Sequence, residues 1–226
     1  MSVETELPGL LNTTPTELLT KILAWIPFPQ ICSLRRLCHL INSIILSTHF
    51  ARQCLYLSLG PAVSGYNPRL RYSGAYSELE GHFLRAPKPF QEIIAGTYWP
   101  ARTMIAWYLA KEFTGAPEAL SALKSLVHLE MRGLVSGVIP ESFGNLKSLK
   151  VLAFSHCGLT GVIPELTGEI PQKSETYRFE GLQLTRNQFS GKLPVELGNL
   201  VKLKMLSLDD NRFSGPVPST WGISCN

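Results

Sequence analysis

The chain has 226 residues, of which 45% are hydrophobic and 17% are charged, enough to form real hydrophobic cores in one large or two modest domains. Its 21 basic and 17 acidic residues give a net charge of only +4, spread along the chain, which argues against the concentrated basic face of a nucleic-acid-binding protein. The longest apolar stretches, such as LINSIILSTHF, are broken by polar residues and too short to span a bilayer, so no membrane contact is expected.

The cysteines and the N-terminus indicate a cytoplasmic or nuclear location. The five cysteines are odd in number and show no CxxC spacing, which favours reduced thiols over a disulfide framework. The opening sequence, MSVETELPGLLNTTPTE, has acidic residues where a signal peptide needs basic ones. We expect residues 1–13 to be a flexible N-terminus.

Residues 14–57 show the pattern of a small helical domain. Thr14 is a candidate N-cap, Pro15 suits the first helical position and Glu17 completes a capping box. An apolar stripe follows at helical spacing and ends before Pro27; its members are Leu18, Leu19, Ile22, Leu23 and Ile26. A second predicted helix begins near Gln30 and places Ile31, Leu34, Cys38 and Ile41 on one face, and helical pattern continues to about Leu57.

This segment resembles an F-box, whose pattern reads LPxELLxxILxxLPxxDLLxLRxVCxxWxxL. Three positions depart from it: Thr14 for Leu, Gln30 for Asp and Ile41 for an aromatic residue. The resemblance implies docking on a Skp-type adaptor, and through it on the cullin of a RING ubiquitin ligase. The adaptor-binding residues that it implies are Pro15, Leu18, Leu19, Ile22, Ile26 and Leu34. The alternative is that the stripe is simply the core of a small helical bundle.

Residues 58–103 are rich in Gly, Pro and Tyr and read as a linker with some local order. Within it, FQEIIAGTYWP predicts a short helix that covers the open upstream end of the next domain, with Tyr98 and Trp99 suited to that role. Trp107, just beyond, is expected to pack in the first strand layer.

Residues 104–226 contain a repeat. The copies LVHLEMRGLVSGVIP, LKVLAFSHCGLTGVIP, FEGLQLTRNQFSGKLP and LKMLSLDDNRFSGPVP align, and a degenerate fifth copy, MIAWYLAKEFTGAP, precedes them. In the expected alignment of this first copy, Met104 corresponds to Leu126 and Trp107 to Leu129. The prolines at 140, 164, 194 and 218 lie 24, 30 and 24 residues apart, the longer interval arising from a doubled LTG-x-IP.

Each copy predicts a short strand whose alternate leucines point inward, so that Leu152, Leu184 and Leu208 line one interior. Asn187, Asn211 and Cys157 occupy the slot where the chain leaves the strand, and a buried polar side chain there can pair turn backbone groups that no strand reaches. The glycine of each copy, such as Gly161, permits positive φ at the turn. One repeat cannot bury its own apolar edge, so several must stack.

The repeat resembles the plant-type leucine-rich repeat, LxxLxxLxLxxNxLSGxIPxxLGxL. The resemblance implies an α/β architecture in which an all-α F-box module precedes a short solenoid, with parallel strands on the concave face and short or 3-10 helices on the convex face. It also implies that an unidentified target protein binds the concave face. The candidate target-binding residues are His128, Glu130, Arg132, His156, Gln183, Thr185, Arg186, Ser207, Asp209 and Asp210.

The sequence predicts a binding protein, not an enzyme, with no cofactor and no metal. The five histidines lie far apart, Cys157 has a structural slot, and neighbours such as Asp209 and Asp210 point to opposite strand faces. The expected function is substrate recognition in a cullin–RING (Skp–cullin–F-box type) E3 ubiquitin ligase. Two alternatives remain: a leucine-rich-repeat scaffold or receptor-like interaction protein without a ligase role, and a relative whose F-box no longer docks.

Overall fold

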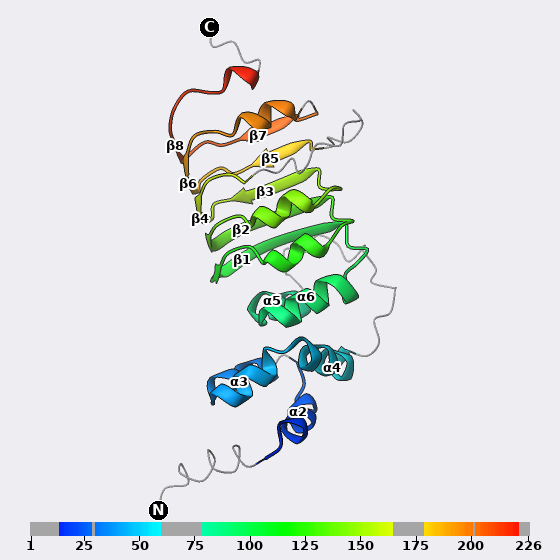
Figure 1. Ribbon diagram of the computed structural model, residues 1–226. Coiled ribbons are helices and arrows are strands. Elements are labelled where there is room, and N and C mark those ends of the chain that lie inside the picture. Colours follow the sequence, from blue (N-terminus) through cyan, green and yellow to red (C-terminus); the bar gives the residue numbers. More distant parts are fainter. Residues whose placement is uncertain (1–13, 29, 60–77, 165–178, 201, 222–226) are drawn as a thin grey trace, which may run out of the picture. The chain divides into compact units, whose positions relative to one another are not determined.

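The computed structural model describes residues 14–28, 30–59, 78–164, 179–200 and 202–221, which belong to two compact units (Figure 1). The described residues of the first unit lie within 14–59 and 78–98, and those of the second begin at Trp99. The expected flexible segment 1–13, residues 60–77 of the expected linker and part of the doubled LTG-x-IP lie outside the described residues.

The described residues of the first unit form helices. Its elements are α2 (Thr16–Ala24), a 3-10 helix (Gln30–Arg36), α3 (His39–Ile45), α4 (Thr48–Leu59), α5 (Glu78–Arg85), α6 (Lys88–Ile93) and a π-helical turn (Ile94–Tyr98). None of the helices within the described residues is long and apolar enough to cross a membrane.

Two helix boundaries differ from the sequence prediction. Helix α2 begins one residue later than expected, with Pro15 at the N-cap in place of the predicted Thr14. The predicted second helix divides at Cys38, whose extended backbone separates a 3-10 helix from α3 and whose sulfur accepts a hydrogen bond from the Ile41 amide at 3.5 Å. Side-chain capping by Cys38 gives α3 its own start, which a continuous apolar face could not reveal.

The core of this unit is apolar, and a hydrogen bond holds the segment after α2 against α4. Leu19 and Leu23 of α2 are buried, as are Phe50 and Leu55 of α4. The Phe28 amide donates a hydrogen bond to Ser58 Oγ at 2.9 Å, so the chain after α2 is tied to the last turn of α4.

An aromatic cluster joins α5 and α6 to the first helices. The ring of Phe90 stacks on Phe28 with centroids 5.5 Å apart and meets Phe50 edge-on at 6.4 Å, while His82 of α5 lies edge-on to Phe28 at 6.2 Å. Phe83 and Phe90 are fully buried. Residues 78–98 therefore pack within the helical unit, where the sequence had predicted a linker with some local order.

Replacing Phe90 by Ala is expected to destabilise the helical unit by about 3–5 kcal/mol, because a fully buried ring leaves a cavity that the structure fills only in part. Urea unfolding followed by circular dichroism measures this loss. Thr97→Ala, at an exposed position of the same segment, is the matched control and should change stability by less than about 0.5 kcal/mol. Equal stability of the two variants would mean that residues 78–98 are only a linker.

The second unit is a stack of parallel strands. The tier β1, β2, β3, β5, β7 runs side by side in that order, and β4, β6 and β8 continue the ladder beyond the turn that follows each strand (Figure 1). The bounds are β1 (Met104–Thr114), β2 (His128–Gly137), β3 (Val151–Ser155), β4 (Gly158–Gly161), β5 (Gly181–Gln183), β6 (Gln188–Gly191), β7 (Met205–Ser207) and β8 (Arg212–Phe213).

Three short 3-10 helices return the chain to the next described strand, Glu118–Ala122, Glu141–Asn145 and Val195–Asn199, and a fourth, Ser219–Trp221, follows β8. The first three start directly after Pro117, Pro140 and Pro194, each at φ near −60° and extended ψ. A fixed φ suits the residue before a helix, which explains why each copy of the repeat carries this proline. The predicted solenoid of parallel strands and short helices is confirmed.

The first strand confirms a fifth layer but corrects its register. Trp107 pairs with Met131, and Ile105 pairs with Leu129, so the expected match of Trp107 to Leu129 is wrong by two positions. The register shifts between Leu109 and Phe113, after which Phe113 meets Val135 as expected. The alternation of side chains along a strand explains this register, because it buries Ile105, Trp107 and Leu109 on the same face of β1.

Gly133 explains why β2 runs without a break where β3 and β4 are separate. This residue has φ +107°, and a Cβ built on it would overlap the carbonyl oxygen of Leu109 in β1. Only glycine fits there, since both the dihedral angle and the close approach forbid a side chain. The repeat copy at residues 126–140 is one residue shorter than the others and has Gly133 where they have a polar slot residue. With this glycine, β2 continues to pair with β1.

The interior of the solenoid contains the leucines that the repeat predicts. Leu152, Leu182 and Leu184 are fully buried, whereas Leu206 and Leu208 of the last layer are half-buried. The positive φ values at Gly137, Gly161, Gly191 and Gly215 also follow the prediction. The partial exposure of the last two leucines follows from their place in the last described layer of the stack.

Candidate functional site

An apolar stripe on the outer face of α2 is the main feature of the helical unit. Leu18, Ile22 and Trp25 follow one another at helical spacing, and their exposed fractions are 49%, 53% and 77%. Large apolar side chains that gather on one exposed helix face mark protein-binding surfaces. We call these three residues the α2 stripe.

The other predicted adaptor residues divide between surface and core. Pro15 is exposed beside the stripe, Ile26 and Leu34 are half-buried, and Leu19 is only 6% exposed. Leu19 therefore stabilises the unit from within and is not available as contact surface. Trp25 was not among the predicted residues, although its position three residues after Ile22 places it on the same face.

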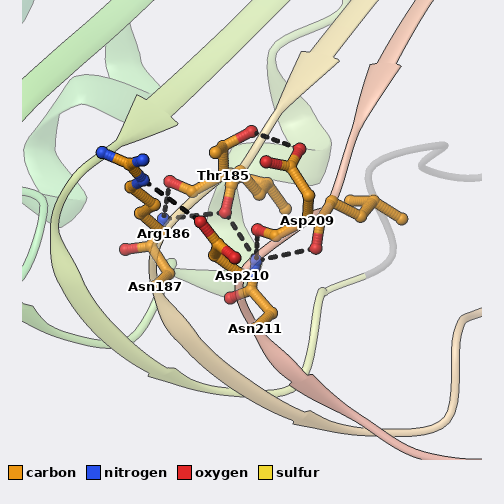
Figure 2. A network of polar contacts seen from close by, with 8 residues as sticks. Thr185, Arg186, Asn187, Asp209, Asp210 and Asn211 are labelled. Atoms are coloured by element: carbon orange, nitrogen blue, oxygen red, sulfur yellow. Dashed lines mark hydrogen bonds and ion pairs between the residues drawn. The ribbon is translucent and has the colours of Figure 1, made fainter.

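Two asparagines hold the turns that end the strands, and Figure 2 shows both. Asn187, 7% exposed, donates from Nδ2 to the carbonyl oxygens of Phe154 at 2.6 Å and Leu184 at 2.9 Å, and its Oδ1 accepts from the Leu159 amide at 3.2 Å. Asn211 repeats this pattern one layer later, at 2.8 Å from Leu184 O and 2.9 Å from Leu208 O. Each side chain thus links neighbouring layers through groups that would otherwise be unpaired.

Cys157 occupies the same slot with a thiol. Its sulfur lies 3.5 Å from the carbonyl oxygens of both Met131 and Ser155. Burial raises the pKa of the Cys157 thiol to about 11, so at neutral pH it is protonated and can donate. A protonated, buried thiol is a poor nucleophile, which supports a structural role for this cysteine.

Five of the ten predicted target-binding residues lie on strands, on the face opposite the buried leucines, and the other five follow directly after the ends of β3, β5 and β7. His128, Glu130 and Arg132 alternate with the buried Leu129 and Met131. The parallel register places Glu130 beside Ala153, Ala153 beside Gln183 and Gln183 beside Ser207, so these positions form one row across four strands. The backbone thus brings the predicted residues together on one surface, which we call the strand face.

Side chains on this face pair between layers (Figure 2). Thr185 Oγ1 donates to Asp209 Oδ1 at 2.9 Å, and Arg186 Nε donates to Asp210 Oδ2 at 3.1 Å. Each aspartate therefore has its own hydrogen-bond partner in the neighbouring layer.

One backbone position is strained in three successive layers. His156, Arg186 and Asp210, each directly before the slot residue, adopt φ of 57°, 57° and 54°. Side chains other than glycine rarely take this left-handed conformation, and it persists only where the surrounding structure enforces it. The slot residues supply that enforcement and fix the three side chains at the end of the strand face.

Tyr108 joins the strand face although the sequence analysis did not name it. Its hydroxyl donates to Glu130 Oε1 at 3.2 Å, and His128 Nε2 lies 3.5 Å from Glu130 Oε2. Partial burial, together with the nearby Glu130 carboxylate, raises the pKa of Tyr108. The pairing of β1 with β2 places Tyr108 next to Glu130, but the sequence alignment had shifted this part of the first strand by two residues and so did not reveal the contact.

A second missed group lies where the strands begin. Glu180 accepts hydrogen bonds from Lys204 at 2.8 Å and pairs with Lys150 at 3.1 Å, so three layers are bridged by one carboxylate. The hydrogen bonds from Lys204 and Lys150 lower the pKa of Glu180. The bridge is therefore complete at neutral pH and is lost in acid as this carboxylate becomes protonated.

The Arg186–Asp210 pair is expected to contribute little to folding. Both side chains are about 60% exposed, at 60% and 63%, and exposed ion pairs typically contribute less than about 1 kcal/mol. A double-mutant cycle with Arg186→Ala and Asp210→Ala, measured by urea unfolding, should give a coupling energy below about 1 kcal/mol. A coupling above about 2 kcal/mol would make the pair part of the scaffold and remove it from the candidate binding surface.

No group of three or more side chains that could hold a metal ion is present in the part of the chain that the structure describes. The geometry of both surfaces, an apolar helix face and a polar strand face, suits protein partners.

Comparison with known families identifies both units. Residues 15–53 match the F-box domain, and residues 148–170 and 202–222 match the Leucine Rich Repeat. The chain therefore combines an F-box domain with leucine-rich repeats.

Similar proteins share the repeat. Receptor-like protein 39 of Arabidopsis thaliana is 36% identical over 37% of this chain and 12% of its own length, and Receptor-like kinase TMK4 of the same plant is 32% identical over 37% and 11%. The solved structure of the plant peptide hormone receptor RGFR1 in complex with RGF2 aligns with a TM-score of 0.50 and 30% identity, over 60% of this chain and 20% of the receptor chain. The chain thus spans a small part of the length of these relatives.

Proposed function

We propose that the protein is the substrate-recognition subunit of a cullin–RING ubiquitin ligase of the Skp–cullin–F-box type. In this function the helical unit binds a Skp-type adaptor, and the strand face of the solenoid holds a target protein. The observation that carries the proposal is the exposed α2 stripe within a segment that matches the F-box domain.

The α2 stripe supports docking on energetic grounds. Burying one large apolar side chain contributes roughly 1.5–3 kcal/mol, and Leu18, Ile22 and Trp25 each keep about half or more of their surface exposed. A partner that covers the stripe recovers this surface. A bundle core alone needs only the buried positions such as Leu19 and Leu23, so the alternative of a purely structural stripe leaves the outer residues unexplained.

The strand face supports binding of a protein over binding of a polyanion. It presents acids and bases together, with Asp209 and Asp210 beside Thr185 and Arg186 in adjacent layers. Mixed charge of this kind gives orientation and specificity to a protein partner, whereas a nucleic acid requires one dominant positive sign.

The direct test is binding of the purified chain to a purified Skp-type adaptor, measured by isothermal titration calorimetry. The proposal predicts a one-to-one complex. The same titration with a chain that starts at residue 99 should show no binding, because the helical unit is removed. An intact chain that does not bind the adaptor would refute the ligase function.

A second function, a receptor-like interaction protein without a ligase role, is favoured by the repeat relatives, which are named as receptors. The two functions require different compartments. The ligase function places the chain in the cytoplasm or nucleus, and the four cysteines that the structure describes are all free, which supports a reducing compartment. Cell fractionation decides between them, because a glycosylated, extracellular product would favour the receptor-like function.

A further inference from the structure

A groove on the helical unit lies between α2 and α4, on a different face from the α2 stripe. Its cavity volume is about 630 Å³, within the range of ligand sites. The lining residues are Thr16, Glu17, Thr20 and Lys21 of α2, and His49, Arg52, Gln53 and Tyr56 of α4.

Helical spacing explains how these residues face one another. On α4 the lining positions recur at three, four and seven residues from His49, which is one face of a helix. On α2, Thr16 and Thr20 lie on the side opposite Leu18 and Ile22, since each residue turns the helix by about 100°. The threonine side of the groove is therefore separate from the α2 stripe, whereas Lys21, four residues before Trp25, lies at the border between the two surfaces.

The groove carries a net positive charge, and its two cationic side chains form no ion pair with described residues. Lys21 and Arg52 contribute two cationic side chains, against the single carboxylate of Glu17. Within the residues that the structure describes, no ion pair neutralises Lys21 or Arg52. Unpaired cations at the rim of a concavity attract a complementary negative ligand.

The walls between these charges are largely hydrocarbon. Threonine methyl groups, the methylene stems of Lys21, Arg52 and Gln53, and the exposed ring of Tyr56 supply it. Such walls suit an aliphatic side chain between acidic ones, whereas a free inorganic anion would leave them uncovered.

The length of the groove sets the size of the ligand. The α4 residues from His49 to Tyr56 span about 10 Å at 1.5 Å per residue. An extended peptide covers the same length with about three or four residues at roughly 3.3 Å each.

We propose that the α2–α4 groove binds a short, extended acidic segment of a partner protein, with acidic side chains at Lys21 and Arg52 and an apolar side chain between them. This site is distinct from the proposed adaptor surface and does not depend on the ligase function.

The test is fluorescence polarisation with the full chain and a fluorescein-labelled peptide of sequence Asp-Glu-Leu-Asp-Glu, at about 0.15 M salt, where long-range attraction is screened beyond about 8 Å. Saturable binding of this peptide is expected. The neutral analogue Asn-Gln-Leu-Asn-Gln and the basic analogue Lys-Arg-Leu-Lys-Arg should not bind. A Tyr56→Ala variant, which removes apolar wall and no charge, should also weaken binding of the acidic peptide.

The deciding comparison uses two double variants of equal net charge. Lys21→Glu with Arg52→Glu should weaken peptide binding at least tenfold, whereas Arg35→Glu with Arg36→Glu, at exposed positions outside the groove, should change it less than about twofold. Equal weakening in both double variants, or no saturable binding by the wild type, would overturn the groove as a site. Ile22→Ala separates the two proposals, because it shortens the α2 stripe without adding a charge beside Lys21 and should leave peptide binding intact even if adaptor binding is lost or never occurs.

Discussion

Asn187→Asp should destabilise the solenoid by about 3 kcal/mol or more at pH 7. The substitution keeps the size of the side chain and the acceptor for the Leu159 amide, but it replaces the amide donor that pairs with Phe154 O and Leu184 O by a carboxylate oxygen. Two buried carbonyl groups lose their donor, each at about 1–3 kcal/mol, and a charge is buried beside them. Urea unfolding followed by circular dichroism measures the effect.

The pH dependence of this variant gives a second readout. Burial and the facing carbonyl oxygens should raise the pKa of the introduced carboxyl group above its unfolded value of about 3.9. As pH rises from about 4 to the native pKa of the introduced carboxyl group, the variant should therefore lose stability relative to the wild type. When the pH is lowered again, the carboxyl group becomes protonated, can donate a hydrogen bond, and the lost stability should return. A destabilisation that does not vary with pH would contradict this account.

Asn211→Asp is the matched control for position in the repeat. Asn211 makes the same contacts as Asn187 but is half-buried, in the last described layer of the solenoid, where water can reach the carboxylate. Its destabilisation should be less than half that of Asn187→Asp. If both variants lose the same free energy of unfolding, burial between layers is not the reason that the slot asparagine stabilises the solenoid.

Ile22→Glu should weaken binding of the Skp-type adaptor at least ~30-fold, equivalent to about 2 kcal/mol, because a carboxylate would be buried at the centre of the proposed contact. Ile22 is 53% exposed, so the fold should tolerate the change. Trp25→Ala should weaken binding by a similar factor, since exposed tryptophans are frequent anchors of interfaces. Titration calorimetry with the purified adaptor measures both variants.

Val138→Glu is the control for this prediction, because Val138 is 54% exposed but lies on the solenoid. It should leave adaptor affinity unchanged. Leu19→Arg is unsuitable as a docking variant, because a charge at this buried position would unfold the helical unit. If Ile22→Glu and Trp25→Ala bind as tightly as the wild type, the adaptor contacts another face.

The repeat made most of the solenoid predictable. Alternating leucines, a glycine at each turn and a polar slot residue recur at nearly constant spacing, and together they specify one strand per copy. The strands β2, β3, β5 and β7 and the positions of Asn187 and Asn211 follow from that spacing, whereas the 3-10 helices were expected from the resemblance to leucine-rich repeats. The second strand of three copies, β4, β6 or β8, was not predicted. The register of β1 did not follow, because Trp107 satisfies the apolar pattern at two alignments and only pairing with Met131 selects one.

The helical unit was harder to predict because its decisive contacts join distant segments. The stacking of Phe90 on Phe28 joins α6 to the segment that follows α2, and no local periodicity reports such a contact. The sequence also did not predict that the Trp25 side chain is exposed, since an apolar residue on a helix is usually buried. Only the three-dimensional packing distinguishes Leu19, which forms core, from Leu18, which forms surface.

The central claim is that one chain holds an adaptor by its helical unit and a target by its strand face. Affinity purification from cells, comparing the wild type with Ile22→Glu, tests it most directly. The wild type should co-purify adaptor, cullin and at least one further protein, and the variant should lose the adaptor and the cullin while it retains the further protein. A wild-type chain that brings down neither adaptor nor cullin would contradict the claim.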